Sequence, residues 1–358
     1  MKRDVIALGE LLIDFTPIPP EDGKPRFEQN AGGAPMNVLA AVARLGLNTG
    51  FIGCVGEDQF GRFLMDFLDQ QGIDNRGVQV IDTHHTTLAF VHLDEKGERE
   101  FTFYRKHGAD LMLREDDVTE DLFEGVKIFH FGSLSLTAEP SRTATYRAIE
   151  SAIKNGCMIS FDPNLRPPLW GSLEQAKEEI LSVLEHVDVL KLSEEELEFI
   201  SGNDNDTAQE DIRKAAQQDQ WKDVRTEARQ ELRKSIEEST KEIYQQYGIE
   251  LIIVTLGSEG CAIRRGEDFG NVEGIKVKAV DTTGAGDAHL GAMLTSILRE
   301  GQKCGLVDQI LRHIPFSILL DSGRYANLYA AYVTTKFGSA QVMPDFETVK
   351  EFWEERNQ

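Results

Sequence analysis

Short apolar runs recur along the chain, and stretches with helical periodicity separate them. The runs are Val5–Gly9, Phe51–Val55, Lys127–Phe131, Cys157–Phe161, Val187–Leu192 and Leu251–Leu256. Apolar strands that alternate with amphipathic helices are typical of a mostly parallel sheet with helices on both faces. We therefore predict an α/β fold of this kind. The periodicity predicts helices over about 35–46, 58–71, 139–155, 172–185, 288–300 and 323–336.

Composition limits the classes of partner. Lys plus Arg number 38 and Asp plus Glu number 61 in 358 residues, so the net charge is −23. Such a charge disfavours nucleic acids and anionic membranes as partners. The four cysteines are far apart, which is typical of buried or incidental thiols in a reducing compartment. Because the first residues lack the pattern of a signal peptide and no run is long enough to span a membrane, we expect a cytoplasmic protein.

Two stretches depart from the strand–helix repeat of the single domain predicted for 1–358. Residues 76–106 alternate in polarity around Asp94–Gly97, as in a β-hairpin. With a segment near 15–30 they are expected to form a small antiparallel β lid over one edge of the large sheet. Residues 203–247 are rich in Glu, Gln and Lys, and they predict a crossover helix enlarged by an insertion.

Polar residues follow the predicted strands. They are Glu10 and Asp14 after the first, Asp162, Asn164 and Arg166 after the fourth, Ser193 and Glu196 after the fifth, and Gly257 and Gly260 after the sixth. The carboxyl ends of parallel strands form the ligand crevice of open α/β sheets. We therefore expect a binding site at this edge.

The segment Asp281-Thr-Thr-Gly-Ala-Gly-Asp287 carries the most specific chemistry. Alternation over 275–280 predicts a strand before it, and helical spacing from Ala288 predicts a helix after it that ends at Glu300–Gly301. The glycines then lie at a helix N-terminus, where free N–H groups attract anions. An anion cradle beside one carboxylate suits phosphoryl transfer.

This segment has alternative interpretations. It is also compatible with an ordinary Gly-rich turn that has an Asp in the first helical turn. A dinucleotide fingerprint fails, because His289 stands where its third glycine belongs, and the chain contains no P-loop motif. The sequence assigns no role to His289.

The chain resembles the ribokinase-like, or PfkB, family of carbohydrate kinases. An N-terminal signature covers Gly32-Gly-Ala-Pro-Met-Asn37 and continues through Gly53, Gly56, Asp58 and Gly61, and Asp281–Asp287 matches the C-terminal signature. Within the family the bacterial fructokinases are the most similar group. The residues that carry this likeness are Gly9–Phe15, Phe103–Arg105, and Asp162–Arg166 running to Leu169–Trp170.

The resemblance implies roles for the catalytic and sugar-binding residues. Asp287 accepts the proton of the sugar hydroxyl, and the amides of Gly284, Ala285 and Gly286 stabilise charge on the transferred phosphoryl group. Asp14 and Asn37 bind sugar hydroxyls, and Gly32 and Gly33 let the backbone approach the sugar. Arg105 reaches the sugar from the lid, although a surface charge is an alternative interpretation. Asn164 and Arg166 lie near the sugar and the γ-phosphate.

The resemblance also implies a nucleotide site and cofactors. ATP is held by Ser193, Thr255, Gly257, Gly260 and Asn327, and Glu196 acts on Mg²⁺ through water. A monovalent cation such as K⁺ is a further option at Asp281, Thr283 and Gly338. Ser193 departs from the family, which has Asn there, and a capping box of Ser193 with Glu196 is the structural alternative.

The predicted function is ATP-dependent transfer of phosphate to a free sugar, with D-fructose as the acceptor and fructose 6-phosphate as the product. Kinases of the same family for 2-keto-3-deoxygluconate, ribose or a nucleoside are the first alternative. A non-catalytic sugar-binding regulator on the same fold is the second. A homodimer formed through the lid is a further expectation from the family.

Overall fold

A nine-stranded sheet forms the centre of the protein in the computed structural model, which describes residues 2–18, 24, 26–93, 99–202, 222–305 and 310–356. The strand order is β13-β12-β11-β10-β9-β8-β1-β4-β5. The strands are β1 (Val5–Leu8), β4 (Thr49–Gly56), β5 (Asp74–Ile81), β8 (Ile128–Gly132), β9 (Met158–Asp162), β10 (Val189–Ser193), β11 (Leu251–Thr255), β12 (Gly260–Arg265) and β13 (Asp268–Glu273). All neighbours pair in parallel except β11 with β12 and β12 with β13. The prediction of a mostly parallel sheet is therefore confirmed.

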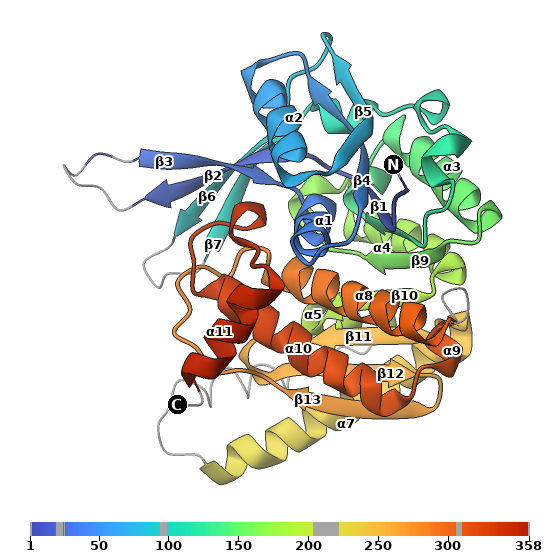
Figure 1. Cartoon of the computed structure of the whole chain (residues 1–358), viewed down its shortest axis with the longest axis vertical. Helices are drawn as coiled ribbons and strands as arrows, with labels where there is room; N and C mark the ends of the chain where they lie inside the picture. Colours follow the sequence, from blue (N-terminus) through green and yellow to red (C-terminus); the bar gives the residue numbers. More distant parts are fainter. Residues whose placement is uncertain are drawn as a thin grey trace.

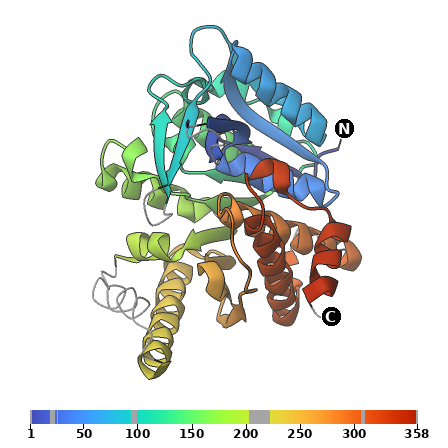
Figure 2. The ribbon, with the colours of Figure 1, turned by 90° about the vertical axis from the view of Figure 1, so that its left-hand side faces the viewer.

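Helices cover both faces of this sheet (Figures 1 and 2). They are α1 (Ala34–Arg44), α2 (Gln59–Gln71), α3 (Ser141–Lys154), α4 (Leu173–Val183), α5 (Glu194–Ser201), α7 (Lys222–Tyr247), α8 (Ala285–Cys304), α9 (Ile310–His313), α10 (Phe316–Thr334) and α11 (Phe346–Arg356). Successive residues of a strand point to opposite faces, so each strand feeds two cores. Val5 and Ala7 of β1 pack with α1, α8 and α10, whereas Ile6 and Leu8 pack with α3, α4 and α5.

A second sheet of four strands stands beside the N-terminal half of the large sheet, on the left in Figure 1. Its order is β3-β2-β6-β7, with β2 (Leu12–Ile18), β3 (Arg26–Gly32), β6 (Leu88–Leu93) and β7 (Arg99–Tyr104). The hairpin pairing of β6 with β7 is antiparallel, as is that of β2 with β3, but β2 and β6 run parallel. The predicted turn at Asp94–Gly97 lies outside the described residues.

One boundary of the predicted lid is wrong. Residues 76–81 belong to β5, which pairs in parallel with β4 at the edge of the large sheet. A half-exposed edge strand alternates in polarity just as a hairpin strand does, so the pattern could not separate the two.

Three further predictions, all for the C-terminal part of the chain, need correction. Residues 275–279 form no strand and instead run as irregular backbone along a cavity. Helix α8 does not end at Glu300–Gly301 but continues to Cys304, where Gly305 caps it in a left-handed conformation. Gly301 is buried within the helix. Helix α10 begins at Phe316, earlier than predicted, because Pro315 supplies its start.

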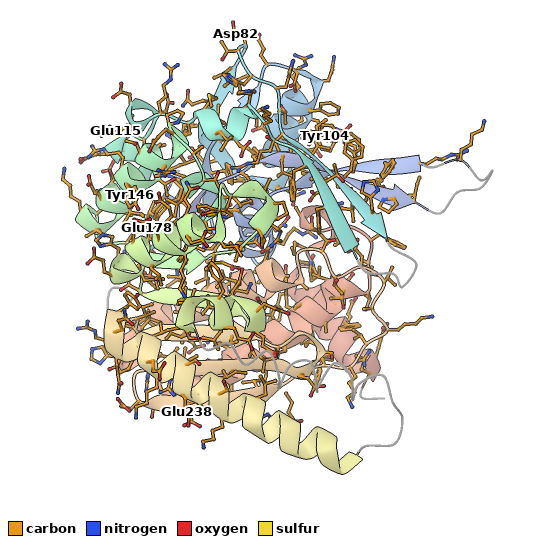
Figure 3. All side chains as sticks on the ribbon, turned by 180° about the vertical axis from the view of Figure 1, so that it is seen from behind. Asp82, Tyr104, Glu115, Tyr146, Glu178 and Glu238 are labelled. Carbon is orange, nitrogen blue, oxygen red and sulfur yellow. The ribbon has the colours of Figure 1, made fainter. Side chains whose placement is uncertain are left out.

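The stretch 203–247 is described from Lys222 onward, where α7 runs to Tyr247 before β11 begins. Figure 3 shows this helix crossing the back of the molecule, with Glu238 on its outer side. Ile236 and Ile243 on its inner side are buried in the core. Among the described residues, no helix is long and apolar enough to cross a bilayer.

Candidate active site

The N-terminus of α8 is built for close approach of an anion. Gly284, the residue that caps the helix, has φ of 71°, a left-handed conformation that glycine adopts without a steric penalty. The first N–H groups of the helix have no partner within it and lie at the positive end of its dipole. Asp287 falls in this first turn and is buried, with 8% of its surface exposed. The predicted arrangement of glycines and acid at one helix tip is therefore present.

A hydrogen bond joins this helix tip to the N-terminal part of the chain. Asn37 in the first turn of α1 donates from Nδ2 to Oδ2 of Asp287 over 2.8 Å. Both side chains are buried, and the Oδ1 atom of Asn37 has no hydrogen-bond partner among the described residues. Residues 250 positions apart thus meet in the folded protein.

Two buried carboxyl groups, those of Asp14 and Glu10, come from the N-terminal part of the chain. Burial, with the nearby carboxyl of Glu10, raises the pKa of Asp14 to about 7, while Arg166 opposes the shift. Burial likewise raises the pKa of Glu10 to about 7. One oxygen of Glu10 accepts the N–H of Ala34 at 2.8 Å, and its Oε2 has no partner among the described residues. The sequence places Glu10 after the first strand but does not single it out as a site residue.

Glycines make room for this group of carboxyls. A Cβ at Gly32 would lie 2.1 Å from Oδ2 of Asp14, and one at Gly33 would lie 2.1 Å from the carbonyl oxygen of Glu10. Gly33 also has φ of 115°. Backbone therefore borders Asp14 directly, and the approach of these glycines to a sugar stays a prediction.

Asp287 is tuned by burial and by charges on both sides. Burial and the nearby Asp162 raise its pKa to about 6, whereas Lys191, the Asn37 hydrogen bond and Arg166 lower it. The carboxylate is therefore mostly ionised at pH 7 and can accept a proton.

Lys191 is a site residue that the sequence reasoning missed. Its ammonium lies 2.9 Å from Oδ2 of Asp162, and its side chain is 7% exposed. Burial lowers the pKa of Lys191, but the carboxyls of Asp162, Glu196 and Asp287 raise it above its usual value. A Cβ at Gly286 would lie 2.9 Å from Nζ, so the cation packs directly beneath the helix tip. A lysine between Leu190 and Leu192 of a predicted buried strand was the signal that could have found it.

A cavity of about 500 Å³ lies on the other side of the helix tip. Thr255, Gly257, Gly260 and Asn327, all predicted to bind nucleotide, line it together with Gly286 and His289. Ser193 is not among the lining residues, although it pairs with Thr255 across β10 and β11. Asn327 is held in place by donating to the carbonyls of Glu273 at 3.0 Å and Val272 at 3.3 Å.

Ser193 and Glu196 form the capping box that was the structural alternative. Oγ of Ser193 accepts the N–H of Glu196 at 3.2 Å, and Oε2 of Glu196 accepts the N–H of Ser193 at 2.8 Å. The other oxygen of Glu196 accepts the N–H of Leu165 at 2.7 Å. Burial raises the pKa of Glu196, which Lys191 opposes. Each carboxylate oxygen still has a lone pair, so the group fits a Mg²⁺ contact through water.

The three residues proposed for a monovalent cation lie together. Asp281 accepts the N–H of Thr283 at Oδ1 over 2.7 Å and that of Gly338 at Oδ2 over 3.0 Å. Asp281 does not end a strand, because residues 274–279 before it form none. Among the described residues, no group of three or more His, Cys, Asp or Glu side chains forms a metal cluster.

Arg105 is buried, so the surface-charge interpretation is wrong. Its guanidinium donates to Asp110 at 2.7 Å, to Leu134 at 2.8 Å and to Thr137 at 2.9 Å. These contacts fix it near Glu10, whose pKa it lowers. A direct contact with a sugar stays a prediction.

Asn164 and Arg166 occupy the loop after β9. Asn164 has φ of 45°, and its N–H donates to Oδ1 of Asp162 at 3.2 Å. Arg166 is half-buried, and its charge lowers the pKa of both Asp14 and Asp287. The loop thus brings a cation to the pocket where these two carboxyls meet.

An α/β sheet whose carboxyl edge holds a buried carboxylate on a glycine-rich helix tip, with a separate cavity beside that tip, has the architecture of a phosphotransferase. Residues 2–345 match the pfkB family of carbohydrate kinases. The chain belongs to this family.

Similar proteins of known name agree with this membership. A probable fructokinase-2 from Arabidopsis thaliana is 37% identical over 345 residues, which cover 95% of this chain and 92% of that protein. The crystal structure of a fructokinase from Xylella fastidiosa with bound ATP has a TM-score of 0.79 and 31% identity, with 100% of each chain covered. A double-mutant fructokinase from Vibrio cholerae with fructose, ADP and potassium ion bound has the same TM-score and identity, with 98% of each chain covered.

Proposed function

We propose that this protein transfers the γ-phosphate of ATP to D-fructose and forms fructose 6-phosphate. The observation that carries the proposal is the hydrogen bond between Asn37 and Asp287. It supports the proposal because Asp287 then lies between Asp14 and the cavity of Thr255 and Asn327, so that an acceptor sugar and a donor nucleotide would meet at the tip of α8.

The residues divide the chemistry between them. Asp287, with its pKa raised to about 6, accepts the proton of the attacking hydroxyl. The N–H groups at Gly284, Ala285 and Gly286 donate to the phosphoryl oxygens on which negative charge accumulates. Asp14 and Asn37 hold the sugar hydroxyls, and Arg166 neutralises charge beside them. Because phosphoryl transfer depends mainly on alignment and charge neutralisation, these groups suffice for the protein's part.

Two metal ions are part of the proposal. Glu196 would act on Mg²⁺ through water, and Asp281, Thr283 and Gly338 would hold the loop around K⁺. Bound Mg²⁺ would neutralise negative charge on the phosphates. The potassium-bound Vibrio cholerae fructokinase supports the second ion.

The relatives favour fructose over the alternative sugars. A named fructokinase aligns over 95% of this chain. The buried carboxyls and carboxamide would be left unpaired by an acceptor without matching hydroxyls, which gives strong discrimination.

The test is a panel of sugars assayed for ADP release with ATP and Mg²⁺, with and without K⁺. We expect the largest kcat/KM for fructose. Turnover of ribose, 2-keto-3-deoxygluconate or a nucleoside in place of fructose would show that the protein is a kinase with a different acceptor. Sugar binding without ADP release from any acceptor would favour the non-catalytic regulator instead.

The four-stranded sheet is proposed to act as a lid over the sugar pocket and to pair with a second copy. Exposed apolar side chains on it support this, namely Phe27 at 37%, Ile18 at 38% and Tyr104 at 65%. Figure 3 labels Tyr104 on this sheet, where it lines a cavity together with Asp58 and Phe60 at the start of α2. Sedimentation equilibrium should give a dimer for the protein and a monomer for Tyr104→Glu. A monomeric wild-type protein at high concentration would contradict the dimer.

One domain over 1–358, with 203–247 as an enlarged crossover, is proposed as well. Burial of Ile236 and Ile243 from α7 in the core of the large sheet supports it. A single cooperative unfolding transition is the expected result.

A cytoplasmic location is proposed on the basis of the cysteines, none of which forms a disulfide and three of which are buried. Cell fractionation tests it.

A further inference from the structure

His289 occupies an unusual place in the wall of the nucleotide cavity. It lies one helical turn beyond Ala285 and Gly286, and all three residues line the cavity. Residues three and four apart share one face of a helix, so the imidazole continues the surface that the anion-binding amides begin. Only 2% of its surface is exposed.

Neither ring nitrogen of His289 has a hydrogen-bond partner among the described residues. The side chain of Asn327 is beside the ring and raises the pKa of His289, while its own N–H groups are donated to the carbonyls of Val272 and Glu273. Only its oxygen is left to face the ring, so Asn327 can serve at most one of the two ring nitrogens. Burial of an unpaired polar group is costly, and an apolar side chain of similar shape avoids that cost. A buried imidazole at a cavity wall therefore requires a partner that enters the cavity.

The partner is a neutral polar group. Burial, together with the ammonium of Lys191, lowers the pKa of His289 to about 3, so the ring is uncharged at neutral pH. A neutral imidazole offers one donor and one acceptor. Phosphates are served by the amides at the helix tip one turn away, and Ile275, Val277, Ala330 and Ala331 give the rest of the wall an apolar lining suited to a nucleoside.

We propose that His289 hydrogen-bonds the nucleoside part of the nucleotide, through the 6-amino edge of the purine or the 2′-hydroxyl of the ribose. The proposal rests on the proposed function, because it needs a nucleotide in this cavity. His289 is then a specificity-determining residue that the family signature does not include.

The experiment is calorimetric titration of ADP into the wild-type protein, His289→Phe and His289→Asn. Phenylalanine keeps the approximate shape and removes both nitrogens, so we expect ADP to bind about three- to tenfold more weakly. Asparagine can both donate and accept, and it should recover part of the loss. Fructose affinity should be unchanged in both variants. ADP affinity of His289→Phe within twofold of wild type would overturn the proposal.

Thermal unfolding separates this role from a purely structural one. Without nucleotide, His289→Phe should be at least as stable as wild type, because an unpaired buried group is removed. Its stabilisation by ADP should be smaller. Lower stability with an unchanged ADP effect would show a structural role and contradict the inference. His130→Phe is the matched control, since His130 is buried outside the cavity and pairs with Ser160 at 3.0 Å. It should lose stability and keep its ADP affinity.

Two ADP analogues identify the group that His289 contacts. If wild type prefers ADP to inosine diphosphate and His289→Phe does not, the contact is with the purine edge. If wild type prefers ADP to 2′-deoxy-ADP and His289→Phe does not, the contact is with the 2′-hydroxyl of the ribose. If neither preference changes, the direct hydrogen bond is excluded. A wild-type protein that fails to bind ADP at all would instead remove the proposed function.

Discussion

The two sides of the α8 tip use different means to form a binding site. On the side proposed for the sugar, called the sugar side below, the side chains of Glu10, Asp14, Asn37 and Asp287 are buried together, and all three of their carboxyls have raised pKa values. On the nucleotide side, the lining near Thr255 is mostly backbone and small or apolar side chains around a cavity of about 500 Å³.

This difference follows from the ligands. A sugar presents hydroxyls in fixed directions, and only placed side chains can match each of them. A nucleotide presents an extended anion and a flat base, which backbone amides and apolar surfaces bind well. We therefore expect substitutions on the sugar side to act through hydrogen bonding and charge. On the nucleotide side they should act through shape.

The largest effect is expected where the two sides meet. Asp287→Asn keeps the acceptor of the Asn37 hydrogen bond but removes the proton acceptor for the sugar hydroxyl. We expect kcat to fall by about 10²–10⁴-fold, with small changes in the KM of either substrate. Steady-state kinetics with fructose and ATP measures this.

Glu174→Gln is the matched control for that substitution. Glu174 also lies in the first turn of a helix, but it is exposed on α4. Its removal should leave kcat unchanged. Full activity in Asp287→Asn would assign the base to another residue.

A pair of glycine substitutions should separate the sides. A Cβ at Gly32 displaces the carboxyl of Asp14, 2.1 Å away, whereas a Cβ at Gly260 meets the carbonyl oxygen of Val272 at 2.1 Å. Displacements of this size can cost up to about a hundredfold in kcat/KM. We expect Gly32→Ala to raise the KM of fructose and Gly260→Ala to raise that of ATP.

Gly72→Ala controls for backbone strain in this comparison. Gly72 has φ of 69°, and a Cβ added there would meet no atom within 4 Å, so the substitution brings strain without a clash. Both KM values should stay at wild-type levels. If Gly32→Ala and Gly260→Ala raised the same KM, the division of the site into two sides would be wrong.

Lys191→Met tests the charge balance beneath the helix tip. The ammonium of Lys191 lowers the pKa of Asp287, so its loss should move the acid limb of the kcat/KM profile up by about one pH unit. Leaving Asp162 unpaired should also cost about 3–5 kcal/mol of stability. Asp162→Asn in the same protein should restore much of that stability and should also move the acid limb back towards lower pH, because the carboxylate of Asp162 raises the pKa of Asp287. An unmoved acid limb would show that Lys191 is only structural.

How much of this could be predicted from the sequence differs between the two sides as well. The proximity of Asp14, Asn37 and Asp287 could be predicted, because each belongs to a contiguous sequence signature with a chemical reason for its residue type. The mostly parallel sheet and its helix-covered faces followed from the repeat of apolar runs. The place of β5 in the large sheet could not be predicted, because an exposed edge strand and a hairpin strand have the same alternation of polar and apolar residues.

Lys191 and the cavity wall were beyond the sequence for another reason. Whether a lysine in a strand points to solvent or pairs with Asp162 depends on which strands become neighbours, here β9 and β10. Residues 275–279 alternate like a strand, but they pair with no neighbouring edge and line the cavity instead. Both outcomes depend on contacts between distant segments, which local patterns do not contain.

The smallest expected effect concerns stability and again contrasts the two sides. Burial raises the pKa of Asp287 from 3.8 to about 6, so the folded protein keeps this proton after the unfolded chain has released it. Between these pH values the stability contributed by the group falls as pH rises, and above pH 6 the full penalty of a buried charge remains. A shift of about two units corresponds to about 3 kcal/mol. Asp287→Asn should therefore be more stable than wild type by up to this amount at about pH 8, with the advantage shrinking towards about pH 4. Urea unfolding across that range measures it.

Thr255→Val, on the nucleotide side, has no ionisable group to remove, so its stability difference from wild type should not vary with pH. If Asp287→Asn were more stable than wild type by the same amount at every pH, the buried charge of Asp287 would not be the cause of the difference.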